Sequence, residues 1–243
     1  MIRSALYMLW LIITIIPFGF AVMLTSVFAS GKPVYRVAVS WLTLMTVSSR
    51  WICGVKYRVQ GMENLPDASS MEPVILCPKH QSTWETFALP GLMPHPLAYV
   101  FKKELLKIPF FGWSMAQMDM VHIDRSKRAD AWNKVAEQGQ ALMDKGTWII
   151  MFPEGTRGVR GGKGNYKSGA SRLAIATGAS LVPIAVTSGR CWPRRSFRLR
   201  PGIIDVSIAS PIPSAGREQN ELMKEVETWI EAEMRRLDPE AYA

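Results

Sequence analysis

The chain has 243 residues, which is enough for one domain of ordinary size with a substantial core and an appendage. Its 29 Lys and Arg residues against 20 Asp and Glu residues give a formal net charge of +9, which suits an anionic partner such as nucleic acid, a phospholipid surface or a phosphorylated substrate. The three cysteines and three histidines are scattered, so the sequence offers neither a disulfide framework nor metal-ligand spacing, and a reducing compartment fits best.

The N-terminal segment is apolar. No charged residue occurs from Ser4 to Gly31, and at about 1.5 Å per residue a helix of that length crosses a hydrocarbon core of roughly 30 Å. Three interpretations stay open: a single membrane span, a cleaved signal peptide, or a helix bent at Pro17 and Gly19 that enters one leaflet. The signal peptide is the least favoured, because the apolar run is longer than a usual signal core and only Arg3 charges its start.

A second uncharged stretch runs from Val37 to Ser49 and is too short to span a membrane by itself. Trp41 and Trp51 near its ends favour a helix that lies in the membrane interface, with both rings at headgroup level, and the alternative is a buried core helix. Four cations follow the first apolar segment, so the positive-inside rule places the following chain in the cytoplasm. These cations are Lys32, Arg36, Arg50 and Lys56. We therefore predict membrane-anchoring helices at 1–54 and an α/β domain at 55–243.

Beyond residue 54, strand and helix patterns alternate. The first strand, from Val55 to Val59, alternates apolar and polar residues and stops before Gly61. The further predicted strands are 74–77, 98–101, 120–123, 148–152, 181–186 and 203–208. The predicted helices begin near Ser82, follow Pro109, cover 127–145 and 168–177, and end with an amphipathic C-terminal segment around Trp229. This alternation predicts an α/β layered domain.

A histidine and a carboxylate follow the apolar run at 73–78. That run predicts a buried strand, so His80 is expected at its C-terminal end, where open α/β sheets place their chemistry. If His80 lies in the loop and Ser82 caps a helix, the Glu85 carboxylate reaches one imidazole nitrogen, and the other is free to act as a general base. The alternative is a capping box at 82–85, in which Glu85 only bonds its own helix start.

A second polar motif, Phe-Pro-Glu-Gly-Thr-Arg at 152–157, closes another apolar strand. Its proline and glycine favour a turn, which would hold the polar residues of the motif at the sheet edge that carries His80. These polar residues are Glu154, Thr156 and Arg157. The planar guanidinium of Arg157 suits a phosphate, and Thr156 adds a hydroxyl. The alternative is an ordinary turn with a surface ion pair between Glu154 and Arg157.

Two further segments supply cations near strand ends. The segment after the strand at 98–101 carries three lysines beside an aromatic rim, Lys103 among them, and Arg125 follows a later strand. Such lysines are commonly just solvated, so neither segment indicates a site by itself. His95 and His122 are interpreted as structural.

Four blocks, taken in order from about Val55 to Ser188, resemble the phospholipid/glycerol acyltransferase family, and in particular its 1-acylglycerol-3-phosphate O-acyltransferases. The blocks are His-x4-acid at 80–85, Lys-Glu-Leu with Ile-Pro and Gly at 103–112 followed by Ile-Asp-Arg at 123–125, Phe-Pro-Glu-Gly-Thr-Arg at 152–157, and Val-Pro-Ile at 182–184. The family pattern usually has Asp where this chain has Glu85, which is one methylene longer. The helix start is therefore expected slightly farther from the histidine.

The resemblance implies a central mixed, mostly parallel sheet flanked by helices, and transfer of a fatty acyl group from acyl-CoA or acyl carrier protein to the free hydroxyl of lysophosphatidic acid, forming phosphatidic acid. It assigns His80 as the base and Glu85 as the group that orients it, without an acyl-enzyme. The substrate-binding residues that it implies are Lys103, Arg125 and Arg157 at the phosphate and Glu154, Gly155 and Thr156 shaping that site. The segment 182–184 would line or support the acyl channel.

The thioester is a co-substrate, and no bound cofactor or metal is expected. The predicted partners are membrane lipids and, as one candidate donor, acyl carrier protein. The predicted location is the bacterial inner membrane, with the catalytic domain on its cytoplasmic face. Two rivals stay open: an acyltransferase for another lysophospholipid, and a non-catalytic membrane-anchored protein that binds anionic lipid. A nucleic-acid partner is disfavoured, because no helix-turn-helix, finger or RRM signature is present and the N-terminus is apolar.

Overall fold

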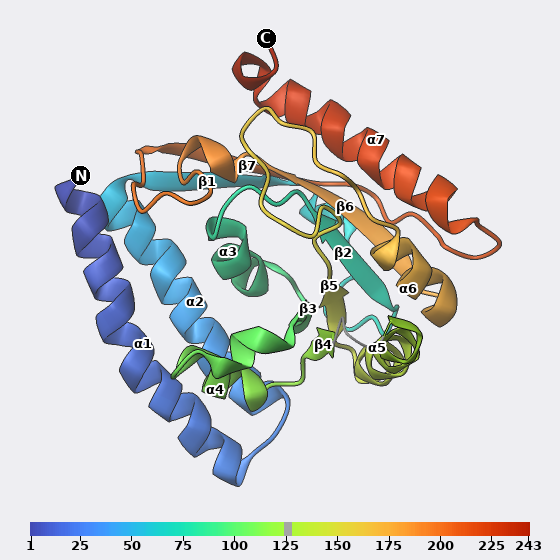
Figure 1. Ribbon diagram of the computed structural model, residues 1–243, viewed down its shortest axis with the longest axis horizontal. Helices are drawn as coiled ribbons and strands as arrows, with labels where there is room; N and C mark the ends of the chain where they lie inside the picture. The colour runs from blue at the N-terminus through green and yellow to red at the C-terminus, as the bar shows by residue number, and fades with distance from the viewer. Residues whose placement is uncertain (124–127) are drawn as a thin grey trace.

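The computed structural model describes the backbone of residues 1–123 and 128–243, and the side chains of these residues except 102–104, 122–123 and 128–131. Within this part of the chain, seven strands form one sheet in the order β1-β7-β6-β2-β5-β3-β4 (Figure 1). The strands are β1 (Val55–Gln60), β2 (Val74–Pro78), β3 (Leu97–Lys102), β4 (Val121–Ile123), β5 (Trp148–Ile150), β6 (Ser180–Val186) and β7 (Gly202–Ile208).

Strand direction follows the expected mixed pattern. Neighbouring strands are parallel except for β6 and β7, which are antiparallel. Each predicted strand is found within two residues at both ends; β5 ends at Ile150 rather than at residue 152. The Met151 N–H still donates to the Leu76 carbonyl at 3.0 Å, so the chain leaves the ladder only as it enters the turn at Pro153.

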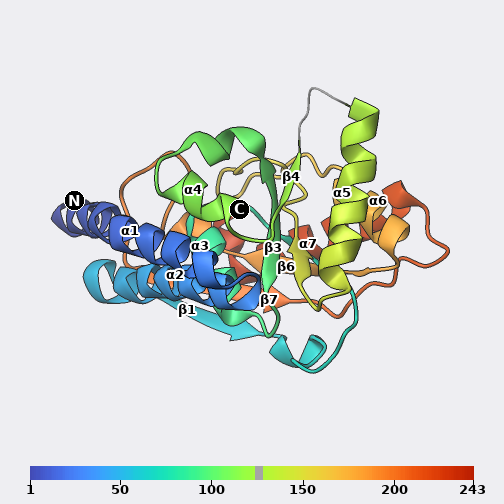
Figure 2. The same cartoon turned by 90° about the horizontal axis from the view of Figure 1, so that it is seen from below.

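The seven α-helices of the described chain form two layers. One layer holds α1 (Ile2–Phe28), α2 (Lys32–Cys53), α3 (Trp84–Leu92) and α4 (Phe111–Ala116), and the other holds α5 (Arg128–Met143), α6 (Gly169–Thr177) and α7 (Gln219–Leu237) (Figures 1 and 2). Short 3-10 turns lie at Met62–Asn64, Lys103–Lys107, Ser188–Arg190 and Pro239–Ala241. The predicted helices are all found, with α3 beginning at Trp84 instead of Ser82.

The central strand β2 is buried on both faces, as its uninterrupted apolar sequence predicts. Its residues alternate between two cores: Val74 and Leu76 pack in the core beneath α1, α2 and α3, and Ile75 and Cys77 pack in the core beneath α5, α6 and α7. Because β5 is a parallel neighbour of β2, the loops that follow both strands meet at one edge of the sheet.

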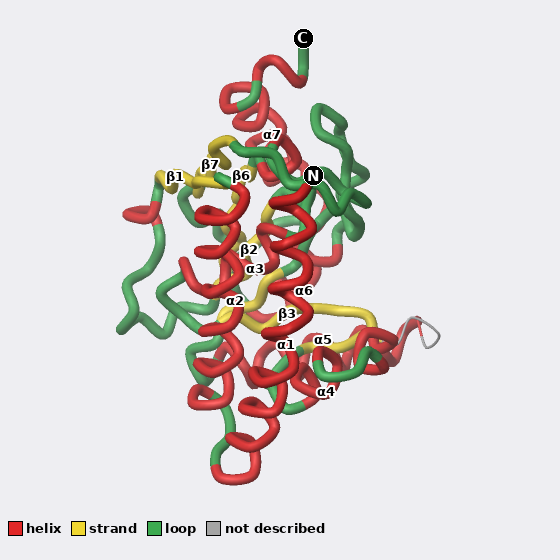
Figure 3. The backbone as a smooth tube through the Cα atoms, turned by 90° about the vertical axis from the view of Figure 1, so that its left-hand side faces the viewer, coloured by secondary structure: helices red, strands yellow, loops and turns green. Residues whose placement is uncertain are grey.

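The helices α1 and α2 lie side by side (Figure 3) and are joined by polar contacts. The Tyr7 hydroxyl donates to the Met45 carbonyl at 3.2 Å, and the Trp41 indole donates to the Thr14 hydroxyl at 3.0 Å. Trp41 is therefore a buried core residue, and its predicted place at the headgroups is wrong, because its ring also packs against Phe87 of α3.

The outer face of α1 remains apolar and exposed. Leu9, Ile13, Phe20 and Leu24 are each more than half exposed, and α1 is long and apolar enough to cross a membrane. The first turn of α1 is also tied to the α/β body, since Ser4 exchanges two hydrogen bonds with the backbone of Leu199 at 3.0 and 3.3 Å.

Candidate active site

The loop between β2 and α3 holds His80 and Glu85 together. The imidazole Nδ1 of His80 lies 3.0 Å from Glu85 Oε1, and the same oxygen accepts the backbone N–H groups of Gln81 and Ser82, each at 2.7 Å. Glu85 thus bonds its own helix start and the imidazole at once, which joins the two interpretations of this motif. Since an ionised carboxylate only accepts hydrogen bonds, Nδ1 is the donor and Nε2 is the nitrogen left for proton transfer.

The start of α3 differs from the expected one. The N-cap position is occupied by Thr83, and Ser82 instead accepts the Trp84 N–H through its hydroxyl at 3.1 Å. The cap of α3 therefore lies one residue beyond the expected Ser82, and Glu85 still reaches the imidazole at 3.0 Å. Glu85 itself is fully buried.

The turn after β5 fixes His80 from a second side. The His80 ring stacks on Phe152, with centroids 3.8 Å apart and planes inclined by 20°. The His80 N–H donates to Glu154 Oε1 at 3.0 Å, and the His80 carbonyl accepts the Gly158 N–H at 2.7 Å. The two sequence motifs thus meet at the histidine, as their shared sheet edge predicted.

A cavity of about 470 Å³ opens beside the histidine. His80, Gly155, Arg157 and Lys167 line one part of it. The remainder is mostly apolar and is lined by side chains of α1, α2, α3 and α4, including Phe18, Val22, Leu42, Phe87, Phe111 and Met115. A cavity with two cations beside a long apolar wall fits a molecule that has an anionic head and a hydrocarbon chain.

Lys167 was not predicted from the sequence. It lies ten residues beyond Arg157 in a glycine-rich segment without a motif, but its N–H donates to the Pro153 carbonyl at 2.9 Å and returns it to the turn. Gly155 has φ of 67°, and a Cβ at this position would lie 3.2 Å from the Lys167 ammonium nitrogen. Glycine therefore permits both the turn and the close approach of the lysine.

The other predicted site residues are distributed as follows. Arg157 is partly buried on the cavity wall, and its carbonyl accepts Arg194 Nη1 at 2.7 Å. Thr156 is exposed next to it. Glu154 is buried and lies 3.3 Å from the Lys79 ammonium, which rules out a surface ion pair with Arg157. The side chains of Lys103 and Arg125 lie outside the described residues.

Three further predicted features support the fold around the site. The segment 182–184 lies buried in β6, and the Ile184 carbonyl accepts the Lys79 N–H at 2.8 Å. This segment therefore supports the backbone of the loop that carries His80. His95 is buried, stacks on Trp148, and places its nitrogens 3.1 and 2.8 Å from the carbonyls of Gly146 and Asp67, which agrees with a structural role. The side chain of His122 is outside the described set.

Among the described residues, no group of three or more His, Cys, Asp or Glu side chains is arranged to hold a metal ion. The three cysteines are buried, and burial raises the pKa of the Cys191 thiol to about 11, which makes it a poor nucleophile. The pKa of Glu154 is also raised, chiefly by burial, while the charge of Lys79 opposes the shift.

Comparisons with known proteins agree with this arrangement. Residues 56–187 match the family model described as Acyltransferase, and the chain therefore belongs to the Acyltransferase family. The chain is 38% identical over 209 residues to the 1-acyl-sn-glycerol-3-phosphate acyltransferase of Pseudomonas aeruginosa, which covers 84% of this chain and 79% of that protein. The coconut (Cocos nucifera) protein of the same name is 30% identical over 73% of this chain and 56% of its own length.

The fold has a close counterpart among solved structures. The crystal structure of the 1-acyl-sn-glycerophosphate acyltransferase PlsC from Thermotoga maritima matches with a TM-score of 0.79, covering 98% of this chain and 95% of that one. At 22% sequence identity this likeness concerns the fold, and it confirms the predicted mixed α/β architecture. The Acyltransferase match ends before β7 and α7, so the C-terminal helix lies outside it.

Proposed function

We propose that this chain is a 1-acylglycerol-3-phosphate O-acyltransferase. It moves a fatty acyl group from a thioester to the free hydroxyl of lysophosphatidic acid and forms phosphatidic acid. The relatives with this name support the reaction. The observation that carries it is the 3.0 Å contact between His80 Nδ1 and Glu85 Oε1 beside a cavity with Arg157 and Lys167 on one part of its wall and apolar side chains on the rest.

In the proposed mechanism, His80 Nε2 takes the proton of the acceptor hydroxyl while the oxygen attacks the thioester carbonyl. The carbon–sulfur bond then breaks, and the leaving thiolate takes the proton from the imidazolium, so the products are an ester and a free thiol. Glu85 stabilises the imidazolium that forms between these two steps. A positioned base contributes about 10² to 10⁴ in rate, and alignment of the two substrates supplies much of the remainder.

The cavity wall beside His80 also supplies the groups that would recognise the acceptor lipid. Arg157 and Lys167 supply positive charge for the phosphate, and the apolar part of the cavity takes an acyl chain. We retain Lys103 and Arg125 as proposed phosphate ligands. Gly155, through its backbone, and Thr156, through its hydroxyl, are proposed to shape the site. Glu154 belongs to the same predicted set, but its hydrogen bond from the His80 N–H favours a role in holding the backbone of the proposed base in place.

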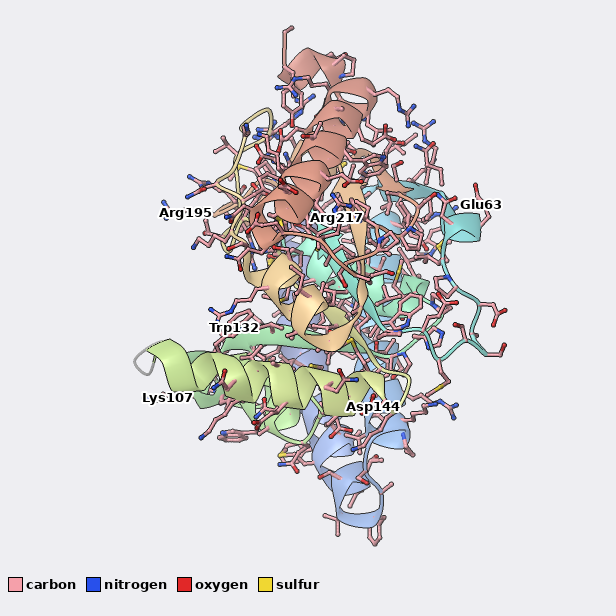
Figure 4. The ribbon with its side chains drawn as sticks, turned by 90° about the vertical axis from the view of Figure 1, so that its right-hand side faces the viewer. Glu63, Lys107, Trp132, Asp144, Arg195 and Arg217 are labelled. Carbon is pink, nitrogen blue, oxygen red and sulfur yellow. The ribbon has the colours of Figure 1, made fainter. Side chains whose placement is uncertain are left out.

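The proposed donor is a soluble thioester, either acyl-CoA or acyl carrier protein, and no bound cofactor is required. The donor is cytosolic while the acceptor is a membrane lipid, so the enzyme is proposed to sit at the cytoplasmic face of the bacterial inner membrane, anchored by residues 1–54. The exposed apolar face of α1 supports this placement. The exposed Arg195, Arg198 and Arg200 add cations, and Arg195 projects outward from the loop between β6 and β7 (Figure 4).

The test is to incubate the purified protein with lysophosphatidic acid and labelled acyl-CoA, or labelled acyl carrier protein in a parallel series, and to measure phosphatidic acid. We expect product from the wild type and none from His80→Ala. Lysophosphatidylglycerol in the same assay identifies a different acceptor preference. A protein that binds anionic lipid without catalysis would retain lipid in both forms and produce no ester in either, which would refute the proposal.

A further inference from the structure

A buried cluster of charges lies behind the histidine loop. The Lys79 side chain is fully buried, and its ammonium nitrogen lies 2.6 Å from Glu231 Oε1 of α7 and 3.3 Å from Glu154 Oε2. It also donates to the Gly162 carbonyl at 3.3 Å. The Tyr166 hydroxyl donates to the same Glu231 oxygen at 2.8 Å. One cation thus stands between two carboxylates inside the protein.

This cluster continues directly to the proposed base. Glu154 uses its second oxygen, Oε1, to accept the His80 N–H at 3.0 Å. Lys79 and His80 are consecutive, and their side chains diverge, since the ammonium contacts α7 while the imidazole lines the cavity. A continuous series of polar contacts therefore runs from Glu231 through Lys79 and Glu154 to the backbone of His80.

Stability alone does not account for such a cluster. Buried ion pairs are costly to desolvate, and apolar residues of similar volume often give an equally stable or more stable protein. Burial raises the pKa of Glu154, and Lys79 is the positive charge that opposes this. Without Lys79, the carboxylate would be isolated among Glu231, Tyr166 and the loop backbone, and its ionised form would be strongly disfavoured.

We propose that Glu231 and Lys79 are positioning residues of the active site. Glu231 and Tyr166 hold the ammonium of Lys79 in place, and Lys79 holds the Glu154 side chain directed at the His80 N–H. The imidazole is thereby fixed against Glu85 and Phe152. This inference rests on the proposed function, and it makes the C-terminal helix α7, which lies beyond the matched residues 56–187, part of the catalytic apparatus.

The first experiment compares Glu231→Gln with Glu227→Gln in the purified full chain. Glu227 lies one turn earlier on α7 and forms an ion pair at 2.6 Å with Lys163, which belongs to the same loop as Gly162 and Tyr166. Within the described part of the chain, its ion pairs are with Lys163 and Lys224, and none is with Lys79. Glu231→Gln keeps the shape and removes the charge. We expect its kcat to fall by about 10- to 100-fold with KM for both substrates within about twofold, because a displaced base loses rate and not binding.

For Glu227→Gln we expect kcat within about twofold of wild type, even if the thermal midpoint falls. Equal losses in the two variants would mean that anchoring of the loop to α7 is what matters, and would overturn the role of Lys79. An unchanged kcat in Glu231→Gln would overturn the proposal as well. Absence of product from the wild type is a different result, which would instead refute the proposed function.

A second variant keeps the test valid if Glu231→Gln does not fold. The double substitution Lys79→Met with Glu231→Leu replaces one buried ion pair by apolar side chains and is expected to fold, with a thermal midpoint below that of the wild type because the buried Glu154 carboxyl loses its cation. We expect its kcat to remain at least about tenfold low. A kcat equal to that of the wild type in this variant would show that the pair is purely structural, and would overturn the proposal. Tyr166→Phe, which removes one hydroxyl, is expected to lower kcat by only about three- to fivefold.

Discussion

Glu85 provides the sharpest test of the proposed chemistry, because one oxygen serves both the imidazole and the start of α3. In Glu85→Gln the amide oxygen still accepts backbone N–H groups, but the negative charge beside His80 is lost. For unit charges about 4 Å apart at an effective dielectric of about 20, the interaction is about 4 kcal/mol. Both side chains are largely buried, so solvent screening is weak. Loss of that interaction with the imidazolium predicts a kcat about 10³-fold lower.

The assay is steady-state formation of phosphatidic acid over a range of both substrates, with a thermal unfolding midpoint for each variant. Ser82→Ala is the matched control, since it removes only the hydroxyl that accepts the Trp84 N–H at 3.1 Å. It is expected to lower the midpoint slightly and to leave kcat within about threefold. A Glu85→Gln enzyme with kcat within tenfold of wild type would show that Glu85 serves the helix start alone, and the reasoning would fail.

Three further outcomes are expected. Arg157→Ala raises KM for lysophosphatidic acid by about 10- to 100-fold with a smaller change in kcat, as initial-rate kinetics will show; an unchanged KM would remove this residue from the phosphate site. Glutamate at Leu9 and Ile13, two exposed positions of α1, releases the protein from anionic vesicles in flotation assays without lowering its thermal midpoint. The pKa of Asp238 is held below 3.8 chiefly by a hydrogen bond from Arg160. The stability that the ionised Asp238 contributes to the fold is therefore complete above pH 3.8 and is lost as the pH falls through the folded-state pKa. Asp238→Asn should be less stable at pH 7, and its stability should fall less steeply with acid in unfolding curves.

Much of the fold follows from local sequence. The uninterrupted apolar run of β2 and the alternating pattern of β1 predict their burial, and the ends of the strands fall within two residues of expectation. Strand order and the reversal between β6 and β7 depend on long-range packing, which no local pattern encodes. Trp41 illustrates the same limit, since an indole near the end of an apolar segment fits a membrane interface equally well until Thr14 and Phe87 are placed beside it.

The site residues also differ in whether local sequence could predict their positions. His80 and Glu85 are five residues apart, in the loop after β2 and in the first turn of α3, so their contact could be predicted from spacing and from the strand before them. Lys167 and Glu231 could not, because their places depend on how the loop after β5 folds back and on where α7 packs. The direction of the Glu154 side chain was also beyond local reasoning, since a turn residue can face the cavity or the core with equal ease.

The turn after β5 explains how one short motif contacts both the loop of the proposed base and the cavity wall. Gly155, with its φ of 67°, reverses the chain between Glu154, which bonds the His80 backbone, and Arg157, which lines the cavity. Gly158 closes the unit by donating to the His80 carbonyl. The backbone of this turn therefore places Arg157 and the His80 loop on the wall of the same cavity. Changes at Arg157 should accordingly alter binding, and changes along the path from Glu231 to Glu154 should alter turnover, so the two effects can be measured independently in one enzyme.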